Sequence, residues 1–401
     1  MKECIHAVSY ERGEGLAPSV AAQFGLDCAK RVSKFHQGFP EYQPTPLVRL
    51  ESLSQRLGVA GIYVKDESHR FGLNAFKGLG GSYCLGAYMA QRLNLSMDEV
   101  SFELLCRGDI REKLGDITFV TATDGNHGRG VAWAASQFGQ KSVVYMPKGS
   151  AAERLSNIQA LGAEASITDM NYDDTVRFAH EQAEKNGWVL VQDTAWAGYE
   201  AIPTLIMQGY TTLVYEVAEQ LGEDVPTHIF LQAGVGSMAA AIASFFADYY
   251  REKPPIITII EPNKADCFYQ TARANDGRLH ATTGAMDTIM AGLACGEPCT
   301  LAWDILRGLA SHYVSMPDYV AAKGMRVLGN PLGGDARIVS GESGASTLGF
   351  VAEILENEAY VPLREQLFLN GQSKIFCIST EGDTDRANYR RVVWDGLYPS
   401  R

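Results

Sequence analysis

The sequence has a deficit of positive charge, and this narrows the range of partners. Its 401 residues include 35 Lys and Arg against 47 Asp and Glu, a formal net charge of −12. We therefore expect neither a nucleic acid nor an anionic membrane as partner, because both bind basic surfaces. The deficit does not exclude a phosphorylated small molecule, since backbone amides bind phosphate as readily as lysines do.

Long apolar runs are also missing. No stretch reaches the roughly 18 charge-free apolar residues of a membrane span. The best candidate, Met238–Ala247, is followed directly by Asp248 and is predicted to be a buried helix. The first fifteen residues, with Lys2 and Glu3, lack the apolar core of a signal peptide. We expect a cytoplasmic protein.

Metal-binding cysteine patterns are absent as well. The eight cysteines stand at positions 4, 28, 84, 106, 267, 295, 299 and 377, and none forms a Cys-x-x-Cys pair. Cys295 and Cys299 have no companion histidine at zinc spacing. We predict no metal site and reduced thiols.

The chain is longer than one hydrophobic core usually covers, so two domains are expected. Strand and helix patterns alternate from about residue 60 to about 262, and a further strand follows near the C-terminus. Such alternation is typical of parallel sheets covered by helices on both faces. The predicted strands are 62–65, 117–123, 141–147, 165–168, 188–192, 228–232, 256–262 and 374–379. The predicted helices are 74–93, 127–138, 151–161 (capped by Ser150), 172–186, 204–220 and 237–250.

In parallel sheets, ligands bind beyond the carboxyl ends of the strands. A lysine stands at a predicted helix start in Asn74-Ala-Phe-Lys77-Gly-Leu-Gly-Gly81. The positive helix end, about half a charge, and the desolvating Phe76 both disfavour an ammonium. They favour the neutral amine that forms imines, so Lys77 is a candidate nucleophile. A solvated surface lysine is the alternative that these residues leave open.

A second motif, Gln232-Ala-Gly234-Val235-Gly236-Ser237-Met238, joins an apolar strand to an apolar helix. Glycines there let the backbone approach an anion, and the first amides of the helix point at it. The spacing is not Gly-x-Gly-x-x-Gly, so a nicotinamide-dependent oxidoreductase is disfavoured even though Glu261 ends the next strand. A small phosphate group suits the turn better; a plain tight turn is the alternative.

A third motif, Thr121-Ala-Thr123-Asp124-Gly125-Asn126-His127-Gly128, again lies between a strand and a helix. Together, the three motifs resemble the fold-type II pyridoxal-phosphate enzymes, which include threonine and serine dehydratases, threonine synthase and serine racemase. The resemblance implies an α/β fold like the tryptophan synthase β chain, with two open, twisted, mostly parallel sheets. It also implies a large cofactor-binding domain (1–84 and 205–401), a small domain (85–204), and a cleft between them for pyridoxal 5'-phosphate.

Residue by residue, the resemblance makes Lys77 the Schiff-base lysine and Asn126 the partner of the cofactor's phenolic oxygen. Gly234, Val235, Gly236, Ser237 and Met238 form the phosphate cup. Thr123, Gly125, Asn126 and His127 seat the substrate carboxylate. One neutral hydroxyl, of Ser379 or Thr380, faces the pyridine nitrogen, and Glu342 either reaches the cofactor edge or bonds backbone in its Gly-rich loop.

Asp124 departs from most of that group, in which a small or hydroxyl residue stands at this position. A carboxylate beside a substrate carboxylate would repel it, so Asp124 is predicted to attract a cation or to handle protons. In racemase-like relatives the equivalent residue faces the substrate opposite the lysine, which would make Asp124 and Lys77 two bases on opposite faces. Asp193, after another strand, is a second acid that favours a substrate with an extra ammonium. A helix cap is the alternative for either acid.

Further segments narrow the resemblance to the diaminopropionate ammonia-lyase family over about residues 44–396. They are 121–135, 170–177, 192–196, 206–210, 289–298, 341–345 and 378–385. This resemblance implies elimination of ammonia from D- or L-2,3-diaminopropionate, an amino-acid substrate, and a homodimer. A serine or threonine dehydratase, or a threonine synthase, is the alternative.

Overall fold

The computed structural model of the chain describes residues 4–11, 20, 22–123 and 125–400. Asp124, a predicted catalytic residue, lies outside these residues. Within the described part, no helix combines the length and apolar character that crossing a membrane requires.

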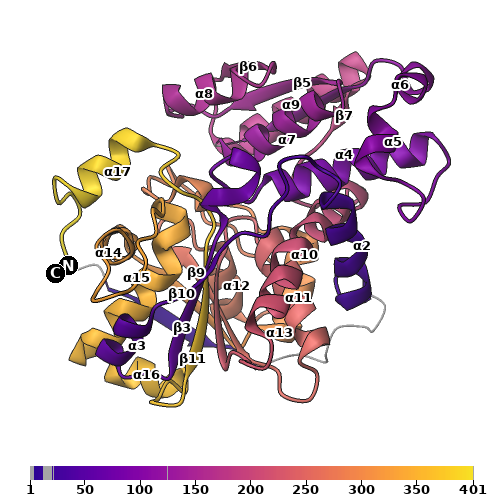
Figure 1. Cartoon of the computed structure of the whole chain (residues 1–401). Coiled ribbons are helices and arrows are strands. Elements are labelled where there is room, and N and C mark those ends of the chain that lie inside the picture. Colours follow the sequence, from indigo (N-terminus) through magenta and orange to yellow (C-terminus); the bar gives the residue numbers. More distant parts are fainter. Residues whose placement is uncertain (1–3, 12–19, 21, 124, 401) are drawn as a thin grey trace.

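Seven strands form the larger of two sheets, in the order β1-β10-β9-β8-β11-β3-β2 (Figure 1). The edge strands β1 and β2 run antiparallel to their neighbours, and all other pairs are parallel. The strands are β1 (His6–Ser9), β2 (Leu47–Arg49), β3 (Gly61–Asp66), β8 (His228–Gln232), β9 (Ile256–Pro262), β10 (His312–Met316) and β11 (Lys374–Ser379). The mostly parallel α/β fold predicted from the sequence is confirmed.

Four parallel strands form the smaller sheet, in the order β6-β5-β4-β7. They are β4 (Thr118–Ala122), β5 (Lys141–Met146), β6 (Glu164–Ile167) and β7 (Val189–Leu190). With them, at the top of Figure 1, lie α7 (Asn126–Gln137), α8 (Ala152–Gln159) and α9 (Tyr172–Asn186). All four strands fall within residues 85–204, and all strands of the larger sheet fall outside them; the domain division itself stays a prediction.

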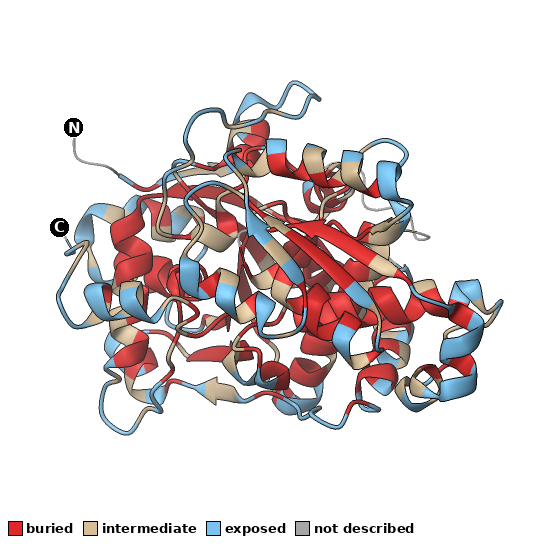
Figure 2. Ribbon diagram, turned by 90° about the horizontal axis from the view of Figure 1, so that it is seen from above, coloured by how far each residue is buried: buried red, intermediate tan, exposed pale blue. Residues whose placement is uncertain are grey.

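Other helices cover both faces of the larger sheet. In Figure 1, α10, α11 and α13 lie on one side of it, and α3, α14, α15 and α16 on the other. Figure 2 shows the buried strands passing between outer helices whose outward faces are exposed. The bounds are α2 (Leu26–His36), α3 (Glu51–Leu57), α4 (Gly78–Arg92), α5 (Phe102–Cys106), α6 (Gly108–Leu114), α10 (Ala201–Leu221), α11 (Ser237–Tyr249), α12 (Cys267–Ala274), α13 (Thr300–Leu309), α14 (Asp318–Gly329), α15 (Glu342–Glu356), α16 (Val361–Gln366) and α17 (Arg386–Val393), with 3-10 turns η1 (Glu67–Gly72), η2 (Ala291–Leu293) and η3 (Glu358–Tyr360).

One predicted helix start and one predicted helix cap are wrong. Helix α4 begins at Gly78 rather than Asn74, because Asn74 has φ of 56° and Ala75 pairs with Glu381 in an isolated bridge. Lys77 is consequently the N-cap residue. Ser150 does not cap α8, since its hydroxyl donates to the carbonyl of Pro147 instead. Strand β10 and the two short edge strands carry no clear periodic pattern, and the sequence did not reveal them.

A buried ionic cluster ties α10 to β3 and η1. The Glu216 carboxylate accepts from Lys65 Nζ at 2.7 Å and from Arg70 Nη1 at 2.7 Å. Arg70 Nη2 also pairs with Glu67 Oε1 at 2.8 Å. All four side chains are buried, so each charge depends on its partners for compensation.

Glu216→Ala is expected to lower the free energy of unfolding by about 3–5 kcal/mol, because it leaves Lys65 and Arg70 buried with too few partners. Urea denaturation followed by tryptophan fluorescence measures the loss. Glu219→Ala, on the exposed side of the same helix, is the control and should shift it by less than about 0.5 kcal/mol. Equal stability of the two variants would contradict the prediction.

Candidate active site

The predicted site residues meet at one cavity beyond the carboxyl ends of β4, β8 and β11. Most of them line it: Lys77, Thr123, Asn126, His127, Asp193, Gly234, Val235, Gly236, Ser237, Met238 and Thr380. Gly125 and Ser379 are not among the lining residues. The strand-end rule therefore located the cavity from sequence.

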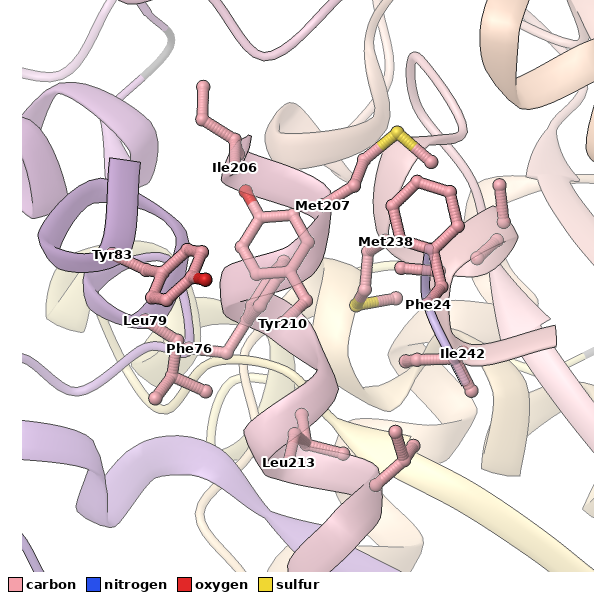
Figure 3. Packing of buried hydrophobic residues seen from close by; sticks show 14 of the residues in the cluster. Phe24, Phe76, Leu79, Tyr83, Ile206, Met207, Tyr210, Leu213, Met238 and Ile242 are labelled. Atoms are coloured by element: carbon pink, nitrogen blue, oxygen red, sulfur yellow. The ribbon is translucent and has the colours of Figure 1, made fainter. Parts of the chain in front are cut away.

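Lys77 lies in this cavity between a carboxylate and two aromatic rings. Its side chain is 18% exposed, and its Nζ forms an ion pair with Asp193 Oδ2. The ring centroids of Phe76 and Tyr210 lie 5.4 and 5.9 Å from Nζ. Figure 3 shows both rings in the apolar packing between α4 and α10. The adjacent carboxylate favours the ammonium form, which opposes the effect expected from the helix start alone.

Asp193 and His127 form the polar wall beside Lys77. Burial alone raises the pKa of the Asp193 carboxyl, but its interactions with His127 and Lys77 outweigh burial and hold that pKa well below its usual range. Burial lowers the pKa of His127. His127 Nε2 lies 2.8 Å from the carbonyl of Val191, so Nε2 carries the proton of the neutral ring. Its Nδ1, 3.7 Å from Asp193 Oδ2, is then an acceptor facing the same region.

The glycine turn before α11 forms a cradle of backbone amides. None of the six N–H groups of residues 234–239 donates to a backbone carbonyl in the described part of the chain, and all six residues line the cavity. Gly236 has φ of +91°, and a Cβ there would lie 2.3 Å from Phe268 Cζ. A glycine is required at this position, and the unbonded amides at the helix N-terminus suit a phosphate group.

In the turn after β4, the Thr123 hydroxyl accepts two backbone hydrogen bonds and keeps its own hydrogen as a donor. Its Oγ1 accepts from the amides of Gly125 at 2.9 Å and Gly128 at 3.0 Å, which leaves its O–H to donate into the cavity. Gly125 has φ of +151°, and a Cβ there would lie 2.9 Å from Arg154 Cδ. Gly125 donates its amide N–H to Thr123 Oγ1 and so shapes the turn, while its contact with a substrate carboxylate stays a prediction.

The two hydroxyls after β11 have different surroundings. Ser379 Oγ donates to Ser340 Oγ at 2.8 Å and is fully buried. Thr380 lines the cavity, and its Oγ1 accepts from Gln232 Nε2 at 3.2 Å. Of the two residues, Thr380 is the one that lines the cavity, and which hydroxyl faces the pyridine nitrogen stays a prediction.

Sequence reasoning missed Glu381, which is 1% exposed and lines the cavity. It accepts from Asn126 Nδ2 at 2.5 Å. The available signal was its place directly after Thr380 in a strand-end loop. Glu342, by contrast, accepts from Asn388 Nδ2 and does not line this cavity. Burial and the neighbouring Glu381 raise the pKa of Glu342 to about 7.

Comparison with known proteins gives concordant matches. Residues 39–361 match the family of pyridoxal-phosphate-dependent enzymes. The chain is 53% identical over 369 residues to diaminopropionate ammonia-lyase of Salmonella typhimurium, with 91% of each chain covered. It is 52% identical over 377 residues to the Escherichia coli enzyme of the same name, covering 94% of this chain and 93% of that one.

Solved structures agree. The crystal structure of Escherichia coli diaminopropionate ammonia-lyase in complex with D-serine superposes with a TM-score of 0.91 at 48% identity, covering 99% of this chain and 98% of that one. Threonine deaminase isoform 2 from Solanum lycopersicum shares the fold, with a TM-score of 0.72 at 20% identity and 96% of each chain covered.

Proposed function

Because the chain belongs to the family of pyridoxal-phosphate-dependent enzymes, we propose that it converts 2,3-diaminopropionate and water to pyruvate and two molecules of ammonia. The observation that carries this proposal is that one cavity is lined both by the ion pair of Lys77 with Asp193 and by the amide cradle of residues 234–239. The near full-length similarity to two diaminopropionate ammonia-lyases supports the choice of reaction.

The residues present fit pyridoxal phosphate. The six amides would hold its phosphate, Lys77 would bind its aldehyde carbon, and Asn126 and Thr380 would meet its ring oxygen and ring nitrogen. When bound, this cofactor supplies the electron sink that stabilises the substrate carbanion. A neutral hydroxyl such as that of Thr380 does not hold a proton on the ring nitrogen, which suits elimination better than transamination.

Two bases are proposed for the two isomers. Lys77 Nζ removes the α-proton of L-diaminopropionate. The α-proton of the D-isomer points the other way, and the carboxylate of Asp124 is the proposed acceptor. This assignment rests on the sequence alone, in which Asp124 follows Thr123 and precedes Gly125. General bases of this kind contribute about 10²–10⁴ in rate.

Asp193 and the Thr123 turn are proposed to orient the substrate. The O–H of Thr123 and the first amides of α7 would bind its α-carboxylate. Asp193 and the bare Nδ1 of His127 are both acceptors, so this wall favours a substrate that brings an ammonium on its β-carbon. Serine and threonine bring only a neutral hydroxyl. The proposed homodimer rests on the family resemblance, and the proposed cytoplasmic location rests on the sequence composition and its N-terminal residues.

The test is direct. Purified protein with added pyridoxal phosphate should show a visible absorption band, and it should form pyruvate and ammonia from D- or L-diaminopropionate. Assayed side by side, serine and threonine should give at least tenfold lower kcat/KM. A preference for either hydroxy amino acid would favour a serine or threonine dehydratase instead, and a protein that stays colourless would remove the whole scheme.

A further inference from the structure

We infer that Glu381 is a positioning residue that sets the orientation of the Asn126 side-chain amide, so that an N–H of Asn126 faces the cofactor's ring oxygen. The inference rests on the proposed function, in which Asn126 meets that oxygen. It adds a residue to which neither the motifs nor the comparisons assign a role.

Three donors converge on the Glu381 carboxylate. Asn126 Nδ2 lies 2.5 Å from Oε2, and Thr384 Oγ1 lies 3.1 Å from the same oxygen. The backbone amide of Ser343, in the first turn of α15, lies 3.1 Å from Oε1. Gly341 packs against the carboxylate, since a Cβ there would lie 3.1 Å from both Cγ and Oε1 of Glu381. The carboxylate is therefore held in one place.

The Glu381 carboxylate can only accept hydrogen bonds, so a side-chain amide that bonds it must turn its NH₂ end toward it. Of the two ends of the Asn126 amide, only Nδ2 can donate to Glu381, so Oδ1 is turned away. Nδ2 carries two hydrogens, and bonding Glu381 uses one of them. The second N–H belongs to a residue that lines the cavity, and it remains available to the ring oxygen.

The contact also joins distant parts of the molecule. Asn126 begins α7 beside the smaller sheet, whereas Glu381 follows β11 of the larger sheet, 255 residues later. An N–H directed at the ring oxygen stabilises negative charge on it. Glu381 thereby acts on the electronic state of the ring through Asn126.

Glu381→Gln separates orientation from space filling. The amide of Ser343 is backbone and cannot reverse, so it holds the glutamine oxygen on its own side. The glutamine NH₂ then faces Asn126, which must turn its Oδ1 toward it and present an acceptor where the donor had been. Glu381→Ala removes the constraint without reversing the amide. If Glu381 orients the Asn126 amide, Glu381→Gln should be the more harmful substitution. If Glu381 only fills space, Glu381→Ala should be the more harmful one.

The experiment uses the cofactor-loaded protein and measures its absorption spectrum across pH, together with the Kd for pyridoxal phosphate. The visible band reports the ring-oxygen anion, and a near-ultraviolet band reports its neutral form. The visible fraction is expected to fall in the order wild type, Glu381→Ala, Glu381→Gln. Cofactor binding by Glu381→Gln should weaken by about tenfold or more, the loss of a charge-assisted hydrogen bond. Combined with Asn126→Ala, Glu381→Gln should add less than twofold.

The matched control is Glu353→Gln, another buried carboxylate that accepts from an asparagine amide, that of Asn357 at 3.1 Å, but lies outside the cavity lining. It should leave the visible band and the Kd unchanged. The inference is overturned if Glu381→Gln is milder than Glu381→Ala, or if both keep the wild-type spectrum while Asn126→Ala does not. A wild-type protein without a visible band would instead overturn the proposed function along with it.

Discussion

Lys77→Ala is expected to eliminate the borohydride-reducible visible band and to lower turnover of L-diaminopropionate by at least about 10²–10⁴. Lys77 is the only lysine among the described residues that line the cavity, so no other amine there can take over imine formation. Its removal also leaves the buried Asp193 carboxylate without its ion-pair partner. Under the proposed function, this variant lacks both the covalent hold on the cofactor and the proton acceptor for the L-isomer.

Absorption before and after borohydride, and pyruvate release from L-diaminopropionate, measure this effect. Lys253→Ala, an exposed lysine outside the cavity, serves as control and should retain the band and the turnover. If Lys77→Ala kept a reducible band of wild-type intensity, the lysine assignment would be wrong, whatever happened to the rate.

Asp124→Asn is expected to reduce kcat for D-diaminopropionate by about 10²–10⁴ and to change the L-isomer rate by less than tenfold. Asparagine has nearly the shape of aspartate but cannot accept a proton at neutral pH, so only the isomer that depends on the Asp124 carboxylate should suffer. Because one enzyme preparation is assayed on two mirror-image substrates, the L-isomer is an internal check on folding and cofactor content.

The ratio of kcat for the two isomers, measured in parallel, gives the outcome. Asp116→Asn removes an exposed carboxylate that pairs with Lys141, and it should leave the ratio unchanged. Equal losses on both isomers in Asp124→Asn would exclude a base specific to one face and would favour a general role in substrate binding.

Structural features that depend on neighbouring residues could be predicted from the sequence. Features that depend on contacts between distant residues could not. Strands β8, β9 and β11 and helix α9 match their predicted bounds because apolar patterns and turn residues act over a few positions. The start of α4 was misplaced because Ala75 pairs with Glu381 and Asn74 bonds Gly382 and Asp383, all more than three hundred positions away. Similarly, Ser379 and Thr380 are equivalent in sequence, and only the position of Ser340 directs one of them away from the cavity.

The sequence by itself determined the α/β class, the glycine turn before α11 and the lysine at a helix start, since these follow from local backbone chemistry. Only the tertiary structure decided which partners those groups have. It paired Lys77 with Asp193 across 116 positions and Asn126 with Glu381 across 255. Hydrogen bonds and ion pairs between such distant residues depend on how the two sheets meet, and no local pattern encodes that geometry.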